Sequence, residues 1–186
     1  MAHSSRLYFL VGPSGAGKDT LLNQLKKIQY ADNQPIVAHR YITRPVREND
    51  ENHIELSEFD FNRRKEAELF LYNWESHGNQ YAIGKEVKKW VKSGQNVIIN
   101  GSRQYLSTAR EVYPKVIPVW LTVSEEVLRQ RLHNRGRETS KEIEARIQIN
   151  RKLEKLKLNN CTFINNDQSI EDTIGQIIAL IEMNNI

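Results

Sequence analysis

Apolar positions along the chain fall into short continuous runs separated by longer amphipathic segments. The continuous runs predict buried strands at 7–11, 36–38, 97–99, 116–123 and 161–165. The amphipathic segments predict helices at 20–28, 57–67, 85–93 and 169–183, with two more beginning at Ser124 and Ser140. Strands that alternate with helices indicate an α/β fold, a mostly parallel five-stranded sheet flanked by helices, with ligands at the carboxyl ends of the strands.

One region departs from this alternation. The apolar-aromatic run Phe70 to Trp74 is followed by turn residues at Gly78 and Asn79, which predicts a small hairpin. The preceding segment HRYITRPVRENDENH, interrupted by Pro45, predicts a polar loop. We therefore expect residues 39–84 to form an insertion in a core of about 6–38 and 85–183.

The stretch LYFLVGPSGAGKDTLL places a glycine-rich loop between the first strand and the first helix. Gly12, four intervening residues, Gly17 and Lys18 give the spacing in which backbone N–H groups surround a polyphosphate and a lysine reaches its outer oxygens. The positive end of the helix adds to this anion site. The expected nucleotide-binding residues here are Gly12, Pro13, Ser14, Gly15, Ala16, Gly17, Lys18, Asp19 and Thr20.

Asp19 breaks the rule of this loop, because the residue after the lysine is ordinarily Ser or Thr and holds Mg²⁺. The strand at 97–99 also ends in Asn100, where phosphate-loop ATPases often carry an acidic metal ligand. The two departures suggest that Asp19 contributes to holding Mg²⁺, directly or through water. Thr20, displaced by one position, is the other candidate.

Two segments are rich in arginine. Arg40, Arg44 and Arg47 lie close together in the polar loop, where guanidinium groups suit phosphate oxygens, although a solvated connection is the alternative. In RQRLHNRGRE, Arg131 and Arg135 would share a helix face and repel each other, which indicates an anionic partner. The bend expected at Gly136 makes a nucleotide lid of about 131–146.

Composition and charge limit the number of domains and the class of ligand. A chain of 186 residues with 39% hydrophobic content suits one domain, 1–186. The net charge of +4 suits nucleic acid or a pocket for several phosphates. Clustering near motifs favours the pocket, and the scattered aromatic residues lack a stacking platform for nucleic acid. Cys161 is expected to be a buried strand thiol, and the short N-terminal apolar run predicts neither a membrane span nor a signal, hence a cytoplasmic protein.

With the phosphate loop, the arginine segment, the HGNQY hairpin and the arginine lid in hand, the chain resembles the guanylate-kinase-like nucleoside monophosphate kinases over nearly its full length. The resemblance implies ATP and Mg²⁺ as cofactors and catalysis by Lys18, Arg131, Arg135 and Arg146. It implies adenine contacts from Asn166 and Asp167. It also implies an acceptor site whose residues are Arg40, Arg44, Arg47, Tyr81 and Arg103.

A closer resemblance, carried by GPSGAGKD, AHRYITR, ENHIELSE, NGSR and RQRLHNRGRE, is to the members that phosphorylate ribose 1,5-bisphosphate to 5-phosphoribosyl 1-diphosphate in phosphonate breakdown. Tyr72 stands where guanylate kinases carry a guanine-reading glutamate, and only Tyr81 remains of their phosphate-binding tyrosine pair. The partners implied are ATP and a small phosphorylated sugar. Two alternatives stay open: a guanylate or other nucleoside monophosphate kinase, and a catalytically inactive module that binds protein partners.

Overall fold

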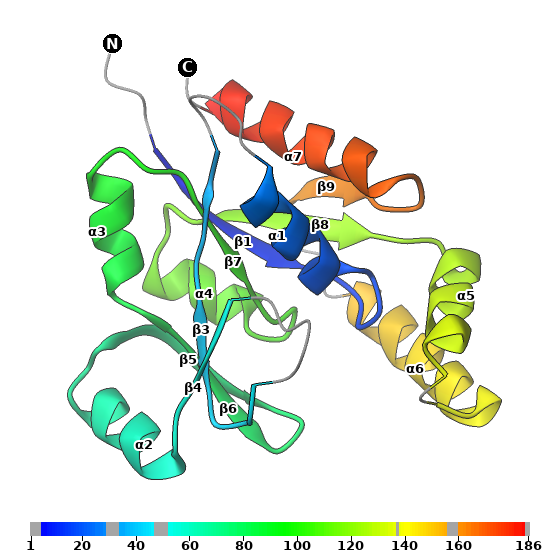
Figure 1. Ribbon diagram of the computed structural model, residues 1–186, viewed down its shortest axis with the longest axis horizontal. Coiled ribbons are helices and arrows are strands. Elements are labelled where there is room, and N and C mark those ends of the chain that lie inside the picture. Colours follow the sequence, from blue (N-terminus) through cyan, green and yellow to red (C-terminus); the bar gives the residue numbers. More distant parts are fainter. Residues whose placement is uncertain (1–4, 29–33, 47–51, 137, 156–159, 185–186) are drawn as a thin grey trace.

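The computed structural model describes residues 5–28, 34–46, 52–136, 138–155 and 160–184 (Figure 1). Its larger sheet has five strands, all parallel, in the order β2 (Ile36–Val37), β7 (Val97–Asn100), β1 (Leu7–Val11), β8 (Ile117–Thr122) and β9 (Thr162–Asn165). In the central register, Phe9 pairs with Ile99 on one side and with Pro118 on the other. The predicted parallel sheet is confirmed.

Strand β1 is an unbroken apolar run because both faces of the sheet are covered. All five of its residues are 1% exposed or less. Tyr8 and Leu10 pack with α1 (Lys18–Lys27) and α7 (Ile170–Asn184) on one face. Phe9 packs on the other face with α3 (Glu86–Lys92) and α4 (Leu106–Val112). The two apolar layers hold the carboxyl end of β1 in a fixed position.

The helices agree with the predicted pattern with two exceptions. Helix α1 begins at Lys18, two residues earlier than expected, because the loop leads directly into its first turn. Helix α4 was not anticipated, because in its seven residues only Leu106 and Ala109 are buried and no helical period can be read from them. In α7, Ile174, Ile177, Ile178 and Ile181 are buried as predicted, and Ile170 packs partly against them.

A second, four-stranded sheet occupies much of the insertion. Its order is β4 (His53–Glu55), β3 (Arg40–Ile42), β6 (Asn79–Gly84) and β5 (Phe70–Ser76), with α2 (Glu58–Glu66) beside it. The hairpin of β5 and β6 is confirmed, but its turn lies one residue earlier than predicted. His77 and Gly78 form it with φ angles of 50° and 72°, and Asn79 already pairs with Ser76 as the first residue of β6.

The prediction that residues 39–53 form a loop is partly wrong. Arg40–Ile42 pairs with β6 on one side and with His53–Glu55 on the other, so a strand forms at each end of that segment. Strands of three residues carry no readable alternation, and only the neighbouring hairpin makes them regular. The cap predicted for α2 is confirmed, since Ser57 Oγ accepts a hydrogen bond from the Asp60 N–H.

The end of α5 (Glu125–Arg135) and the start of α6 (Ser140–Glu154) cover the segment of about 131–146 that the sequence predicts to be a lid, and we call these two the lid helices. Ser124 caps α5 as expected, Gly136 ends it with a φ angle of 62°, and Thr139 opens α6 with a capping box. An apolar contact joins the helices through Leu128, Leu132, Ile143 and Ile147. In Figure 1 the lid helices and the second sheet lie on either side of the loop that precedes α1.

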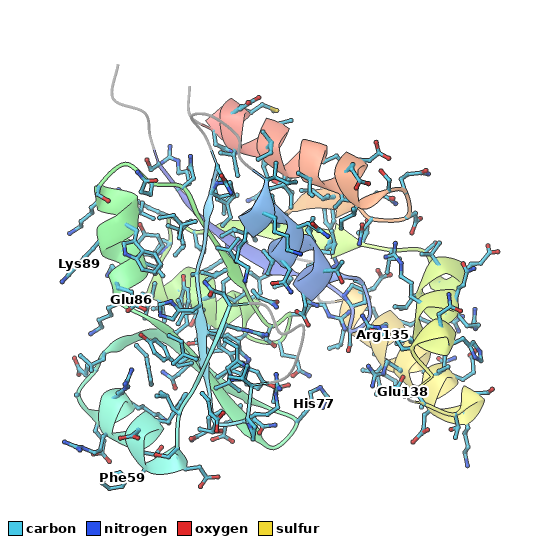
Figure 2. The ribbon with its side chains drawn as sticks, viewed as in Figure 1. Phe59, His77, Glu86, Lys89, Arg135 and Glu138 are labelled. Carbon is cyan, nitrogen blue, oxygen red and sulfur yellow. The ribbon has the colours of Figure 1, made fainter. Side chains whose placement is uncertain are left out.

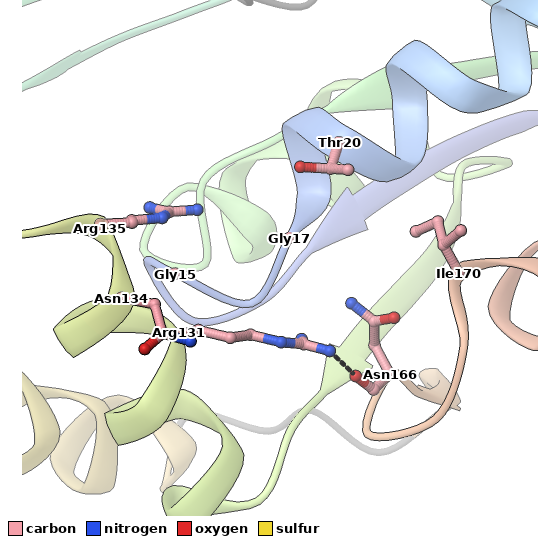
Figure 3. Close-up of a pocket in the computed structure, with 8 residues that line it drawn as sticks. All are labelled: Gly15, Gly17, Thr20, Arg131, Asn134, Arg135, Asn166 and Ile170. Carbon is pink, nitrogen blue, oxygen red and sulfur yellow. Dashed lines mark hydrogen bonds between the residues drawn. The ribbon is translucent and has the colours of Figure 1, made fainter.

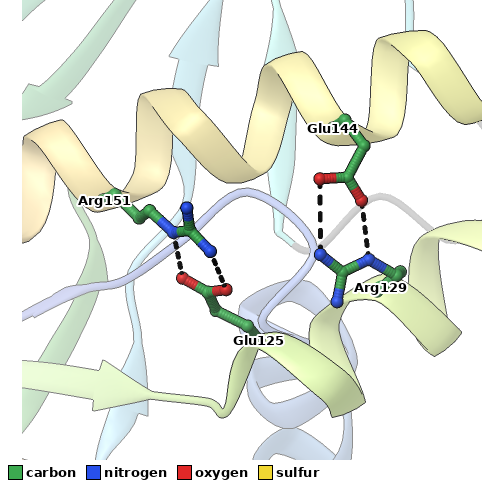
Figure 4. Close-up of polar contacts among 4 residues, drawn as sticks. All are labelled: Glu125, Arg129, Glu144 and Arg151. Atoms are coloured by element: carbon green, nitrogen blue, oxygen red, sulfur yellow. Dashed lines mark hydrogen bonds and ion pairs between the residues drawn. The ribbon is translucent and has the colours of Figure 1, made fainter.

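Two ion pairs also cross between the lid helices (Figure 4). Arg129 Nε lies 2.7 Å from Glu144 Oε1, and Arg151 Nε lies 2.5 Å from Glu125 Oε1. Both pairs hold the pKa values of their carboxyls below the ordinary value, because the arginine donates hydrogen bonds to the ionised form. Two of the arginines near the lid are therefore structural.

Cys161 is half-buried and directly precedes β9, so the prediction of a buried thiol within a strand is wrong: the strand begins one residue later, and the side chain only packs against the edge of the core. Within the described part of the chain, none of the helices combines the length and apolar character needed to cross a bilayer.

Candidate functional site

The glycine-rich loop joins the end of β1 to the start of α1 at the carboxyl edge of the sheet. Gly15 and Gly17 have φ angles of 95° and 89°, which other residues rarely adopt. Lys18 lies in the first turn of α1, and its Nζ donates to the carbonyl oxygens of Gly12 and Pro13, both at 3.1 Å. The ammonium therefore folds back across the loop, beside the positive end of the helix.

A cavity of about 350 Å³ opens between this loop, α5 and the segment that joins β9 to α7 (Figure 3). It is lined by Gly15, Gly17, Thr20, Arg131, Asn134, Arg135, Asn166 and Ile170. Six of these residues are expected from the sequence to bind the nucleotide or to act in catalysis. Asn134 and Ile170 are not among them. Ile170 falls on the core-facing stripe of its helix, and Asn134 lies in RQRLHNRGRE, where only the arginines indicate phosphate chemistry.

The three lid arginines singled out by sequence gather at the loop. Arg131 donates to the carbonyl oxygens of Asn166 at 2.7 Å and of Ala16 at 3.4 Å. Arg146 donates to Ser14 Oγ at 2.9 Å and also bonds Glu138. Arg135 lines the cavity, and Figure 2 shows it near Glu138 at the junction of α5 and α6.

Burial removes water from the Arg131 guanidinium and so disfavours its charged form. Burial lowers the pKa of Arg131, and the neighbouring charge of Arg135 acts in the same direction. Asp167 opposes the shift. A polyanion bound in the cavity would neutralise the positive charges of Arg131 and Arg135 and so relieve their repulsion.

At the start of α1, Asp19 and Asn100 are direct neighbours. Asn100 Nδ2 donates to Asp19 Oδ1 at 2.9 Å, so the extra carboxylate of the loop and the amide at the end of β7 form one unit. Asn100 is 2% exposed, and among the described residues none donates a hydrogen bond to its buried Oδ1. With the Thr20 hydroxyl on the next residue, this edge carries three kinds of oxygen donor that Mg²⁺ accepts.

The donor set fits Mg²⁺ held mainly by phosphates and water. No group of three or more His, Cys, Asp or Glu side chains placed to hold a metal occurs among the described residues. Mg²⁺ usually takes one or two protein oxygens and completes its octahedron with water and substrate phosphates. Asp19 with Thr20 or Asn100 satisfies that requirement.

Asn166 and Asp167, expected at the adenine edge, direct their side chains to protein partners. Asn166 Nδ2 donates to the Ala16 carbonyl at 2.6 Å, and its Oδ1 accepts from Thr173 Oγ1 at 2.7 Å. Asp167 Oδ1 accepts from the Ser124 N–H at 2.7 Å, at the start of α5. These contacts hold the phosphate loop and the lid helix, and they do not favour the predicted role in base recognition.

The predicted acceptor residues lie on the second sheet. The Arg40 guanidinium on β3 stands 5.4 Å from the centroid of the Tyr81 ring on β6, and Tyr81 stacks on Trp74 at 5.7 Å. Arg44 follows β3 and donates to the Pro45 carbonyl at 3.0 Å. Arg47 lies outside the described residues. The structure thus brings Arg40 and Tyr81 together, and the Trp74 stack was not foreseen.

Arg103 connects the turn after β7 to the lid. Its Nη2 donates to Asn150 Oδ1 on α6 at 2.7 Å, and burial lowers its pKa to about 10. Asn150 is 6% exposed and was missed by sequence reasoning, because a single asparagine in a basic helical run gives no signal. The acceptor side and the lid therefore share a polar contact.

Tyr72, at the position of the guanine-reading glutamate, is fully buried. Its ring meets Phe9 edge-on at 5.5 Å and Tyr105 at 6.0 Å. Burial also raises the pKa of its phenol. Tyr72, Phe9 and Tyr105 thus form an aromatic cluster here, and no carboxylate stands at position 72 to bind a guanine edge.

Comparisons with known proteins agree with this geometry. Residues 4–184 match the family model described as guanylate kinase. The chain is 44% identical to ribose 1,5-bisphosphate phosphokinase PhnN of Klebsiella pneumoniae over 95% of its length and 92% of that protein. It is 41% identical to the protein of the same name from Pectobacterium parmentieri, over 96% of its length and 95% of that protein.

A solved structure supports the same assignment at the level of the fold. The guanylate kinase from Anaplasma phagocytophilum superposes with a TM-score of 0.72 at 18% identity, covering 99% of this chain and 88% of that one. The match of the family model to residues 4–184 shows that the chain belongs to the guanylate kinase family.

Proposed function

We propose that the protein is an ATP-dependent kinase that phosphorylates the 1-phosphate of ribose 1,5-bisphosphate, giving 5-phosphoribosyl 1-diphosphate and ADP in phosphonate catabolism. One observation carries the kinase chemistry: Lys18 crosses the glycine loop while Arg131 and Arg146 contact that loop from the lid. The name shared by the relatives at 41% and 44% identity supports the acceptor.

The nucleotide phosphates would occupy the loop and the adjoining cavity. Backbone N–H groups of the loop and the Lys18 ammonium bind the phosphate oxygens, and Arg131, Arg135 and Arg146 neutralise charge on the moving phosphoryl group. Bound phosphates would replace the carbonyl and hydroxyl partners that Lys18 and Arg146 use now. Asp167 stays a weaker proposal for adenine contact, since its carboxylate holds the start of α5.

No general base is needed for this acceptor, because a phosphate oxygen is already ionised at neutral pH. His39 is consistent with that expectation, because its Nε2 lies 3.0 Å from the Glu86 carboxylate. The protein's task is to align donor and acceptor and to stabilise charge. Mg²⁺ held by Asp19, with Thr20 beside it, would supply further neutralisation of the phosphates.

The acceptor would lie between the second sheet and the phosphate loop. Arg44 and Arg47 would bind the accepting phosphate, with the Tyr81 phenol beside them. The guanidinium of Arg40, which lies over the Tyr81 ring, would add positive charge to this site. Arg103 would reach the acceptor from the turn after β7. We divide the chain accordingly into a core, an acceptor region at about 39–84 and a lid at about 131–146. The proposed partners are ATP and a phosphorylated sugar, without nucleic acid or membrane, and a cytoplasmic location remains a prediction.

A guanylate kinase is the second candidate, favoured by the family model and by the fold match. The buried Tyr72 speaks against it. A guanine edge needs polar groups that accept and donate hydrogen bonds, and the loss of such readout lowers discrimination by ~10⁴. An inactive binding module is disfavoured by the intact arrangement of Lys18 with the lid arginines.

An acceptor assay tests the proposal. The protein with MgATP is given ribose 1,5-bisphosphate, GMP or ribose 5-phosphate in parallel, and ADP is followed. We expect turnover with ribose 1,5-bisphosphate to exceed that with either alternative. Preferred use of GMP would refute the acceptor, and tight MgATP binding without turnover on any of the three would support the inactive module.

A further inference from the structure

We propose that Asn166 and Thr173 are a positioning pair that fixes the orientation of the Ala16–Gly17 peptide, so that the Gly17 N–H points into the phosphate site. The inference rests on the proposed nucleotide site and goes beyond it. It assigns the Asn166 amide to the shape of the loop instead of to the adenine base.

The pair is buried and its hydrogen bonds are directional. Asn166 is 2% exposed and Thr173 is fully buried. The single hydroxyl proton of Thr173 has its shortest acceptor in Asn166 Oδ1, at 2.7 Å. With the amide oxygen held there, the amide nitrogen faces the loop, and it donates to the Ala16 carbonyl at 2.6 Å.

The direction of the Ala16 carbonyl sets the direction of the Gly17 N–H. The carbonyl of Ala16 and the N–H of Gly17 lie in one trans peptide plane and point in opposite directions. A carbonyl drawn toward the segment between β9 and α7 therefore turns the Gly17 N–H away from that segment, at the residue that directly precedes α1. N–H groups at that place form the anion-binding concavity of such loops.

Two further contacts fix the same peptide. Arg131 donates to the Ala16 carbonyl and to the Asn166 carbonyl, so it spans both sides of the contact (Figure 3). A Cβ on Gly17 would lie 2.9 Å from Asn166 Nδ2, which shows that the amide packs directly against this glycine. Loss of the amide would free the peptide and a contact of the catalytic Arg131 together.

The alternative is that Asn166 reads the adenine edge. The two roles differ in what they do to ligands without a base. A loop-positioning residue affects inorganic tripolyphosphate and ATP alike, whereas a base-reading residue affects ATP and leaves tripolyphosphate unchanged.

The test measures binding of MgATP, MgITP and magnesium tripolyphosphate to the full chain by calorimetry at pH 8. The variants are Asn166→Asp, which places an ionised oxygen against the Ala16 carbonyl, and Thr173→Val, which keeps the shape but removes the hydroxyl. Thr173→Ser restores the hydroxyl. Gln176→Ala is the matched control, because Gln176 on α7 bonds the main chain of the adjacent Asn165.

For Asn166→Asp we expect MgATP and tripolyphosphate to bind about 10- to 100-fold more weakly, with the preference for ATP over ITP unchanged. Thr173→Val should weaken both about 3- to 10-fold, Thr173→Ser should recover to within about twofold, and Gln176→Ala should match the unaltered protein. A purely structural role would lower the melting temperature without this joint loss in phosphate binding.

Two outcomes would overturn the inference. The first is weaker binding of the nucleotides while tripolyphosphate binds normally. The second is normal phosphate binding by Thr173→Val. Because this variant keeps the shape of the side chain, the test stays decisive even if Asn166→Asp fails to fold. The unaltered protein is measured first, so that failure of the proposed nucleotide site appears there, while failure of the positioning role appears only in the variants.

Discussion

Single side chains on different sides of one helix serve two different purposes in the lid. Arg129 and Arg131 are two residues apart on α5, yet Arg129 pairs with Glu144 across the helices and Arg131 reaches the phosphate loop. The sequence shows two arginines of the same kind. Their separation by role follows from which side of α5 faces the loop.

The pair gives a matched test of catalysis. Arg131→Ala should lower turnover by ~10³, because an arginine that stabilises the transferring phosphoryl group is worth that much or more. Arg129→Ala removes an exposed ion pair that solvent screens, so its turnover should stay within about threefold and its melting temperature should change little. Comparable turnover of the two variants in the ADP assay would contradict the assignment.

Asp19 permits a second test at this scale. If its carboxylate holds Mg²⁺, Asp19→Asn should raise the magnesium concentration needed for half-maximal activity about tenfold or more, since a charged oxygen ligand becomes a neutral one. Thr20→Val is measured beside it and decides between the two candidates. Lys26→Ala, exposed on the same helix, is the control. An unchanged magnesium requirement in Asp19→Asn would dismiss its role.

At the scale of elements, the phosphate loop and α5 support each other sterically. A Cβ on Gly15 would lie 2.9 Å from Leu128 Cδ1 and 3.0 Å from Leu132 Cδ2. Those leucines also pack against Ile143 and Ile147 of α6. The apolar contact that joins the lid helices therefore continues onto the loop.

Gly15→Ala and Gly94→Ala separate this contact from backbone strain. The two glycines have nearly equal φ angles of 95° and 93°, but within the described part of the chain a Cβ on Gly94 meets nothing within 4 Å. Both variants should lose about 1 to 2 kcal/mol of unfolding free energy from the left-handed backbone. Gly15→Ala should lose about 1 to 3 kcal/mol more and should bind MgATP more weakly. Equal losses in urea unfolding, with equal MgATP affinity, would show that the loop does not rest on α5.

Elements also mark where prediction from sequence succeeds. The caps at Ser57 and Ser124 and the turn at Gly78 were predicted correctly because each depends on bonds within a few residues. Strands β3 and β4 were missed because β3 becomes regular only by pairing with β6 of the distant hairpin, and β4 only by pairing with β3.

For the whole molecule, two buried phenols tie stability to alkaline pH. Burial raises the pKa of Tyr8 to about 12 from 10, with Arg6 opposing the shift, and it raises the pKa of Tyr72 as well. The unfolded chain ionises these groups first. Their contribution to stability is thus complete below pH 10 and is lost as the pH rises toward 12.

Tyr8→Phe tests this dependence. Between pH 9 and pH 11 the free energy of unfolding should fall less steeply in the variant, because two pKa units correspond to about 2 to 3 kcal/mol at full ionisation. Burial also lowers the pKa of Arg103, and loss of that proton raises the free energy of unfolding as the pH rises. This contribution is the same in both proteins, so the difference between them reports on Tyr8 alone. Parallel urea-stability curves for the two proteins would refute the shift.

The sequence by itself determined the α/β alternation, the phosphate loop and the lid arginines, because these depend on local periodicity and on fixed spacing along the chain. Only the tertiary structure decided that Asn100 meets Asp19, that Asn150 meets Arg103 and that the Asn166 amide turns to the Ala16 carbonyl. The partners in these contacts are 47 to 150 positions apart. An asparagine pairs equally well with carbonyls, carboxylates and bases, so its partner is fixed only when packing places one donor against one acceptor.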